Sequence, residues 1–149
     1  MKIAIGCDHG GFELKKAIIS HLEKKNYEIK DYGTYTAESC DYPEFGQKVG
    51  EAVVSKECEL GIIICGTGIG ISIAANKVPG VRAALCSDTF SAHATREHNN
   101  ANVLALGART VGVGLALDIV DTFLSSTFEG GRHENRVNKI TDIEKKYNK

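Results

Sequence analysis

Residues 60–70 read LGIIICGTGIG, an apolar run that ends in a cysteine and continues into glycines at alternate positions. The run over 60–65 is apolar throughout rather than alternating, which is typical of a strand covered on both faces. The glycines at 66, 68 and 70 allow a tight turn into a following helix. This stretch therefore predicts a strand of a parallel sheet, with Cys65 at its carboxyl end and helices on either side.

Strand and helix patterns alternate along the rest of the chain. Further strands are predicted over residues 2–7, 27–33, 81–86 and 102–108, and helices over 12–25, 43–54, 70–77, 88–98 and 111–124. Near the end of the chain, apolar residues recur at helical spacing and predict one face of a last helix: Val137, Ile140, Ile143 and Tyr147. We expect a single α/β domain over residues 1–149: a doubly wound, Rossmann-like, five-stranded parallel sheet with helices on both faces and a C-terminal helical arm.

Two of the predicted helices carry additional information. The helix over 88–98 is expected to be capped by Ser87 or Asp88, since both residue types accept the free N–H groups of a first turn. The helix over 111–124, VGVGLALDIVDTFL, is too apolar for a solvent-facing helix. We therefore expect part of it to meet a partner chain.

Composition excludes several classes of function. The chain is 42% hydrophobic and 25% charged, and its net charge of −1 offers no electrostatic footprint for nucleic acid or an anionic membrane. The start of the chain does not resemble a signal peptide, and the longest uncharged stretch, 60–76, is too short and interrupted to span a bilayer. Five cysteines without close pairing indicate reduced thiols, so we expect a cytoplasmic protein.

The loops that follow the strands are the first place to look for a site, because ligands of such sheets bind beyond the carboxyl ends of the strands. The loop after residue 65 spaces its glycines G-x-G-x-G, unlike the dinucleotide fingerprint, and no lysine follows as in a Walker loop. Its backbone N–H groups could still hold an anion. A tight turn with close helix–sheet packing explains the same glycines without any ligand.

Cys65 has two possible roles. A cysteine at a strand end is most often a small buried hydrophobe, and Cys7 and Cys86 fit that description. Cys65 differs because it adjoins the glycine loop at the start of a helix, where a thiolate is stabilised. The chain has no C-x-x-C pair and no cysteine–histidine spacing typical of zinc, so we expect neither dithiol chemistry nor a bound metal.

Histidines and arginines supply the remaining candidates. His9, beside Asp8, and His98, at a helix end, are better placed than His21, which we expect to be solvated. Arg132 and Arg136 are four residues apart and share a helix face. Together with Arg109 they form a set suited to a phosphate, although surface arginines are also common.

Several separated motifs resemble the type B ribose-5-phosphate isomerases. They are IAIGCDHGG (3–11), DYP (41–43), CGTGIG (65–70), REHNNANVLALGAR (96–109) and GGRHENRV (130–137). The resemblance covers nearly the whole chain. It implies an aldose–ketose isomerisation between D-ribose 5-phosphate and D-ribulose 5-phosphate, through a cis-enediolate and without metal or other cofactor.

The resemblance also implies roles for individual residues. Cys65 matches the catalytic base, for which some members use a glutamate elsewhere; Thr67 matches a hydroxyl that helps to transfer protons, and His98 matches the acid that opens the furanose ring. The loop Gly66 to Gly70 matches the anion hole for the enediolate. The matched substrate-binding residues are Asp8, His9, Tyr42, Gly66, Gly68, Ile69, Gly70, Asn99 and the phosphate-binding Arg109, Arg132 and Arg136.

In assembly, the resemblance implies a homodimer, or a dimer of dimers, whose sites draw on both chains. The matched residues form an early group up to the glycine loop and a late group from His98 onward, which includes Arg109. The sequence does not say which residues cross the interface.

Two other functions remain open. A hexose-phosphate isomerase of the same family, acting on allose 6-phosphate or galactose 6-phosphate, would need a deeper pocket. Galactose-6-phosphate isomerases consist of two different chains, whereas all matched positions lie on this one chain, which favours the pentose. A non-catalytic phosphosugar- or nucleotide-binding module would need the glycine loop and the arginines, but has no use for Cys65 together with His98.

Overall fold

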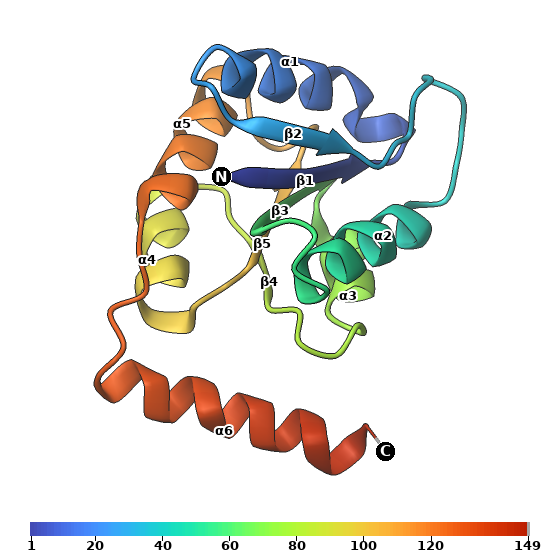
Figure 1. Ribbon diagram of the computed structural model, residues 1–149. Helices are drawn as coiled ribbons and strands as arrows, with labels where there is room; N and C mark the ends of the chain where they lie inside the picture. The colour runs from blue at the N-terminus through green and yellow to red at the C-terminus, as the bar shows by residue number, and fades with distance from the viewer. Residues whose placement is uncertain (149) are drawn as a thin grey trace.

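A five-stranded parallel sheet in the order β2-β1-β3-β5-β4 forms the centre of the computed structural model, which describes residues 1–148 (Figure 1). The strands are β1 (Lys2–Cys7), β2 (Glu28–Asp31), β3 (Leu60–Cys65), β4 (Ala83–Leu85) and β5 (Val103–Gly107). The predicted α/β class and the doubly wound parallel sheet are confirmed. The strands expected over 27–33 and 81–86 are shorter than predicted, and both lie at the edges of the sheet.

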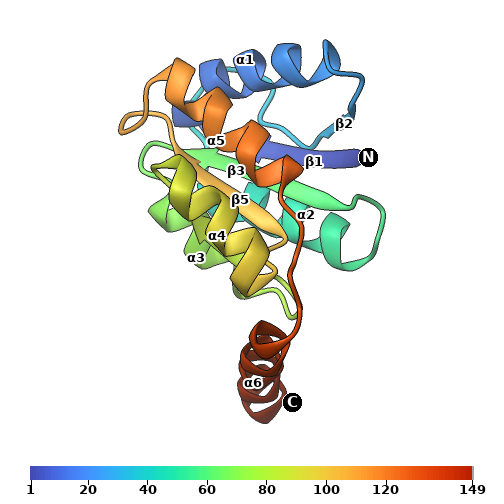
Figure 2. The ribbon, with the colours of Figure 1, turned by 90° about the vertical axis from the view of Figure 1, so that its left-hand side faces the viewer.

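Helices cover both faces of the sheet. One face carries α1 (Phe12–Glu23), α4 (Thr89–Asn99) and α5 (Val113–Ser125), and the other carries α2 (Tyr42–Val54) and α3 (Ile69–Ala75) (Figures 1 and 2). A short 3-10 turn, η1 (His9–Gly11), precedes α1. None of the helices in residues 1–148 is both long and apolar enough to cross a membrane.

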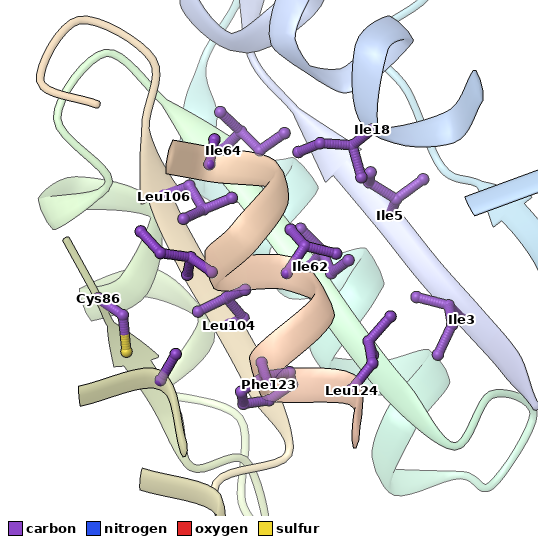
Figure 3. Close-up of a cluster of buried hydrophobic side chains, with 14 of the residues drawn as sticks. Ile3, Ile5, Ile18, Ile62, Ile64, Cys86, Leu104, Leu106, Phe123 and Leu124 are labelled. Carbon is purple, nitrogen blue, oxygen red and sulfur yellow. The ribbon is translucent and has the colours of Figure 1, made fainter. Parts of the chain in front are cut away.

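The continuous apolar run of β3 is explained by burial on both of its faces. Ile62 and Ile64 enter the core beneath α1 and α5, where Ile18 and Phe123 meet them (Figure 3). Ile63 and Cys65 point the other way, into the core under α2 and α3. Each fully buried isoleucine stabilises the fold by about 1.5–3 kcal/mol. A polar residue facing either core would lose this stabilisation, which is why apolar and polar residues do not alternate along β3.

Strand register brings the carboxyl ends of three strands to one edge. Cys7 of β1 is paired with Ile64 of β3, and Cys65 of β3 with Gly107 of β5. The loops that follow these strands therefore begin side by side. This alignment is what makes a site from three separate stretches of sequence.

Asp88 is the cap of α4, one of the two residues predicted for that role. Its carboxylate accepts hydrogen bonds from the backbone N–H and the hydroxyl of Ser91, at 2.6 and 2.9 Å. The same two bonds lower the pKa of Asp88. The cap fixes where α4 begins, and with it where its far end lies.

The expectation for His21 is corrected, whereas a contact of α5 with a partner chain stays a prediction. The apolar character of α5 comes mainly from the chain's own core, which buries Ala116, Ile119, Val120 and Phe123; Val113 and Leu115 are the exposed large side chains of this helix. His21 is not simply solvated, because its Nε2 lies 2.8 Å from a carboxylate oxygen of Asp121 on α5. This pair joins α1 to α5.

The C-terminal arm is the helix α6 (Arg132–Tyr147), which stands apart from the sheet and lies below α4 in both views (Figures 1 and 2). Val137 and His133 are its buried side chains. Ile140, Ile143 and Tyr147, predicted to share its apolar face, are exposed. Among residues 1–148, most of that face has no packing partner.

Candidate active site

Cys65 lies at the carboxyl end of β3 with only 5% of its surface exposed. Its sulfur accepts a hydrogen bond from the backbone N–H of Gly68 at 3.1 Å. An N–H aimed at sulfur favours the thiolate, because the donor interacts more strongly with a negative acceptor. The turn that supplies this donor thus aims a backbone N–H dipole directly at the sulfur of Cys65.

Gly68 can make this bond only as a glycine. Its φ of 77° lies in the left-handed region, which L side chains rarely adopt. A Cβ at this position would also lie 2.5 Å from Leu85 of β4 and 2.8 Å from the backbone of Leu106 in β5. The central glycine of the opening motif is therefore a requirement of the turn's geometry.

Three other thiols, those of Cys7, Cys58 and Cys86, are also buried. Burial raises the pKa of Cys7 and of Cys86 to about 11, and it also raises the pKa of Cys58. Such thiols stay protonated at neutral pH and are inert. They are packing residues, as predicted for Cys7 and Cys86.

Thr67 and Arg109 complete the loop. The hydroxyl oxygen of Thr67 accepts the N–H of Ile69 at 3.2 Å, which leaves its own proton free to be donated. Arg109 donates its backbone N–H to the carbonyl of Gly66 at 2.9 Å, and its side chain lies against that glycine. Arg109 therefore belongs with Cys65, although the sequence grouped it with the late residues.

The loop after β1 touches the same glycine turn. Asp8 is nearly buried; one carboxylate oxygen accepts the N–H of Gly10 at 2.9 Å, and its backbone N–H donates to Ile64. His9 Nδ1 accepts the backbone N–H of Cys40 at 3.2 Å. A neutral imidazole that accepts at Nδ1 carries its proton on Nε2, so His9 has a donor free for a ligand.

Two further residues, Tyr42 and the buried Lys15, hold segments near the glycine loop and after β2. The Tyr42 ring packs on Gly70, where a Cβ would come within 2.6 Å of it. Lys15, 1% exposed, binds Asp31 at 2.7 Å and the carbonyl of Thr34 at 2.5 Å, which ties down the segment after β2. Sequence reasoning missed Lys15, because a lysine in an amphipathic helix ordinarily indicates its solvated face.

The structure thus brings most of the predicted site residues together and leaves four apart. Those at the carboxyl edge are Asp8, His9, Tyr42, Cys65, Gly66, Thr67, Gly68, Ile69, Gly70 and Arg109. The remaining residues are His98, Asn99, Arg132 and Arg136. We call these two sets the cysteine half-site and the histidine half-site.

The histidine half-site lies at the opposite end of the sheet in the same chain. The 11 residues of α4 carry the chain about 16 Å back from the carboxyl edge. At its end, the carbonyl of Asn99 accepts from Arg82, at the amino end of β4, whereas the glycine loop abuts Leu85 at the carboxyl end. Arg132 and Arg136 are exposed on α6.

The two parts of the histidine half-site are joined by stacked rings. The imidazoles of His98 on α4 and His133 on α6 lie 4.3 Å apart and nearly parallel, at 13°. His133 Nε2 is also 3.4 Å from a carboxylate oxygen of Glu129. Sequence reasoning missed Glu129 and His133, although their i,i+4 spacing was a signal that could have found the pair.

Comparisons with known proteins agree on the family. Residues 3–140 match the model of the Ribose/Galactose Isomerase family. A relative from Escherichia coli (strain K12), ribose-5-phosphate isomerase B, is 52% identical over 147 residues that cover 99% of each chain. The structure of Clostridium thermocellum ribose-5-phosphate isomerase B superposes with a TM-score of 0.98, at 63% identity and 99% coverage of both chains.

A third neighbour is ribose-5-phosphate isomerase B from Mycoplasma genitalium with bound ribulose-5-phosphate. It has a TM-score of 0.93 and 45% identity, and the match covers 97% of this chain and 96% of that one. The chain therefore belongs to the ribose/galactose isomerase family. Within that family, the resemblance to the type B ribose-5-phosphate isomerases is confirmed.

Proposed function

We propose that the protein interconverts D-ribose 5-phosphate and D-ribulose 5-phosphate. The observation that carries this proposal is the Gly68 N–H held 3.1 Å from the sulfur of Cys65, in the loop that follows β3 at the carboxyl edge of the sheet. Transfer of a proton between adjacent carbons needs a base and a site that stabilises the oxyanion. Relatives that bear the name of this activity cover 99% of the chain.

In the proposed mechanism, an acid first opens the sugar ring. His98 protonates the ring oxygen while the anomeric hydroxyl gives its proton to solvent water, which leaves an open-chain aldehyde, and His98 then recovers a proton from solvent. The Cys65 thiolate then takes the proton from C2, and the electron pair moves onto the C1 oxygen to form the enediolate. N–H groups of the Gly66–Gly70 loop stabilise that charge, each contributing roughly 10²–10³-fold.

Completion of the reaction returns the proton to C1. Thr67 passes a proton between the oxygens on C1 and C2, and the Cys65 thiol then protonates C1 to yield the ketose. The thiolate is regenerated, so the sequence of steps is balanced without an outside oxidant. The mechanism calls for no metal or other cofactor, since backbone N–H groups take the role of the electrophile.

A direct assay tests the proposal. We expect conversion of ribose 5-phosphate in buffer that contains EDTA, and much lower kcat/KM with allose 6-phosphate and galactose 6-phosphate. A preference for either hexose phosphate would reassign the substrate within the family. Phosphosugar binding without conversion of any of the three would support a binding module instead.

We also propose that the enzyme is a homodimer, or a dimer of dimers, in which the histidine half-site of one chain completes the cysteine half-site of the other. A hollow of about 560 Å³ lies between α6 and β4 and not beside Cys65. Its walls include the otherwise unpacked Ile140 and Ile143. A second copy seated there would cover these side chains and supply the missing residues.

The proposed compartment is the cytoplasm. All five cysteines are free, including the half-exposed Cys40. A reducing compartment keeps such thiols from pairing or oxidising. The catalytic role of Cys65 needs the same protection, because a thiolate is the form that oxidants attack.

The phosphate contacts can be tested on α6. Arg132→Ala and Arg136→Ala should each raise the KM for ribose 5-phosphate about tenfold or more, because a charge-assisted hydrogen bond contributes roughly 1.5–3 kcal/mol. Lys139→Ala is the matched control, since it removes an exposed cation one turn further along the same helix. Inorganic phosphate should also inhibit the arginine variants less. An unchanged KM and unchanged phosphate inhibition in both would show that the pair does not bind phosphate.

The packing of the glycine loop gives a second test. A Cβ at Gly107 would lie 2.5 Å from the carbonyl oxygen of Thr67 and clash with Thr110. We expect Gly107→Ala to cost about 1–3 kcal/mol of stability and to displace the loop, lowering turnover. Gly114→Ala has open space and should be neutral or stabilising by up to about 1 kcal/mol. Equal melting temperatures and rates for the two variants would contradict this packing.

A further inference from the structure

Three side chains with metal-binding atoms meet where α4 ends and α6 begins. His98, Glu129 and His133 each offer one ligand atom, and these atoms all lie within 4.8 Å of one another. Within residues 1–148, this is the one such group of three histidine, cysteine or acidic side chains. Two imidazoles and one carboxylate are a ligand set that Zn²⁺ uses in proteins, with a fourth position left for water or substrate.

Two of the three ligands already have the spacing of a zinc site. The Nε2 of His133 and a carboxylate oxygen of Glu129 are 3.4 Å apart. Ligands at about 2.0–2.1 Å from a tetrahedral ion lie roughly 3.3 Å from each other. His133 is 7% exposed, so packing holds its ring in place, and its backbone N–H is fixed by the carbonyl of Gly130 at 3.0 Å.

The backbone also holds the two segments together. The N–H of Glu129 donates to the carbonyl of Glu97, in the last turn of α4, at 3.0 Å. His98 follows directly after Glu97, so the spacing between the ligand-bearing backbones is set by a hydrogen bond. Only the side chain of His98 has to move. Its ring lies parallel to that of His133, so it must turn for its nitrogen to point at a shared ion.

We propose that His98, Glu129 and His133 form a Zn²⁺ site, and that the bound ion inhibits the isomerase. The inhibition, unlike the binding, rests on the proposed function of His98. An imidazole nitrogen that donates its electron pair to zinc cannot also carry the proton needed to open the sugar ring. The ion is an inhibitor and not a resident cofactor, because the nearby Arg132 and Arg136 oppose a cation and keep its binding reversible.

Calorimetry tests the site itself. The full chain is treated with EDTA, desalted and titrated with ZnCl₂, and we expect one ion bound per chain. Glu129→Gln and His133→Asn should each weaken this binding by at least about tenfold. His93→Asn is the matched control: His93 faces Glu97 at 3.0 Å on the same helix, but that pair lacks a third ligand. Binding of wild-type strength in both Glu129→Gln and His133→Asn would overturn the site, since zinc held by thiols survives these changes.

The activity assay tests the inhibition separately. Zinc should reduce turnover of ribose 5-phosphate over the same concentrations at which it binds, and EDTA should restore the rate. Relative to its own metal-free rate, Glu129→Gln should need at least about tenfold more zinc for the same loss. Full turnover at saturating zinc would overturn the inhibition. If the EDTA-treated enzyme does not convert ribose 5-phosphate at all, the proposed function fails, while calorimetry still decides whether the site exists.

Discussion

Cys65→Ala should lose at least about a hundredfold in kcat with ribose 5-phosphate, because a positioned base contributes typically 10²–10⁴-fold. Binding of the phosphosugar should persist. The phosphate is assigned to arginines, and the remaining polar contacts come from other loops. The loss should therefore appear in kcat and not in the dissociation constant measured by calorimetry. Near-wild-type turnover would remove Cys65 from the mechanism.

Two further cysteine variants separate chemistry from packing. Cys65→Ser keeps an acceptor near the Gly68 N–H, yet a hydroxyl does not ionise at neutral pH, so its kcat should also be low. Cys86→Ala removes a thiol that is equally buried and whose pKa is about 11, and it should retain activity after a modest loss of stability. A Cys86 variant as inactive as Cys65→Ala would mean that lost packing explains both.

Much of the fold could be predicted from local pattern, because local pattern and burial agree along the central strands. The unbroken apolar run of β3 reflects cores on both of its faces, and the run predicted over 102–108 contains β5. Prediction was poorer at the edges of the sheet. The strand β4 ends at Leu85, although the apolar residues continue to Cys86. The length of β4 is set by its pairing with β5 and not by hydrophobicity.

The site could be predicted in part for a related reason. The rule that loops meet at the carboxyl edge of parallel strands correctly brings Asp8, His9 and the glycine loop together. The prediction that Arg109 belongs with the late residues was wrong. Arg109 is late in the sequence, but it follows β5, and β5 pairs with β3. The contact between His98 and His133 joins two helices of different direction, and no spacing rule on one chain predicts such a contact.

Mixing two inactive variants tests the shared site, and we expect Cys65→Ala and His98→Ala to restore activity together. Each chain carries a cysteine half-site at one end of its sheet and a histidine half-site at the other. In a mixed dimer, one site combines both lesions, whereas the second combines an intact Cys65 with an intact His98. With random exchange, half of the dimers are mixed and half of their sites are intact, so about a quarter of wild-type activity should return.

The position of Arg109 supplies the matched control for this experiment. Arg109 lies against Gly66 in the cysteine half-site, so a mixed dimer of Cys65→Ala and Arg109→Ala has one lesion in each site and should gain nothing. Mixing Cys65→Ala with Arg132→Ala or Arg136→Ala should instead behave like the His98 pair, since both arginines lie on α6. Subunit exchange is verified with two affinity tags. A fully active monomer, or proven exchange without any rescue by the His98, Arg132 and Arg136 variants, would show that each site is built from one chain.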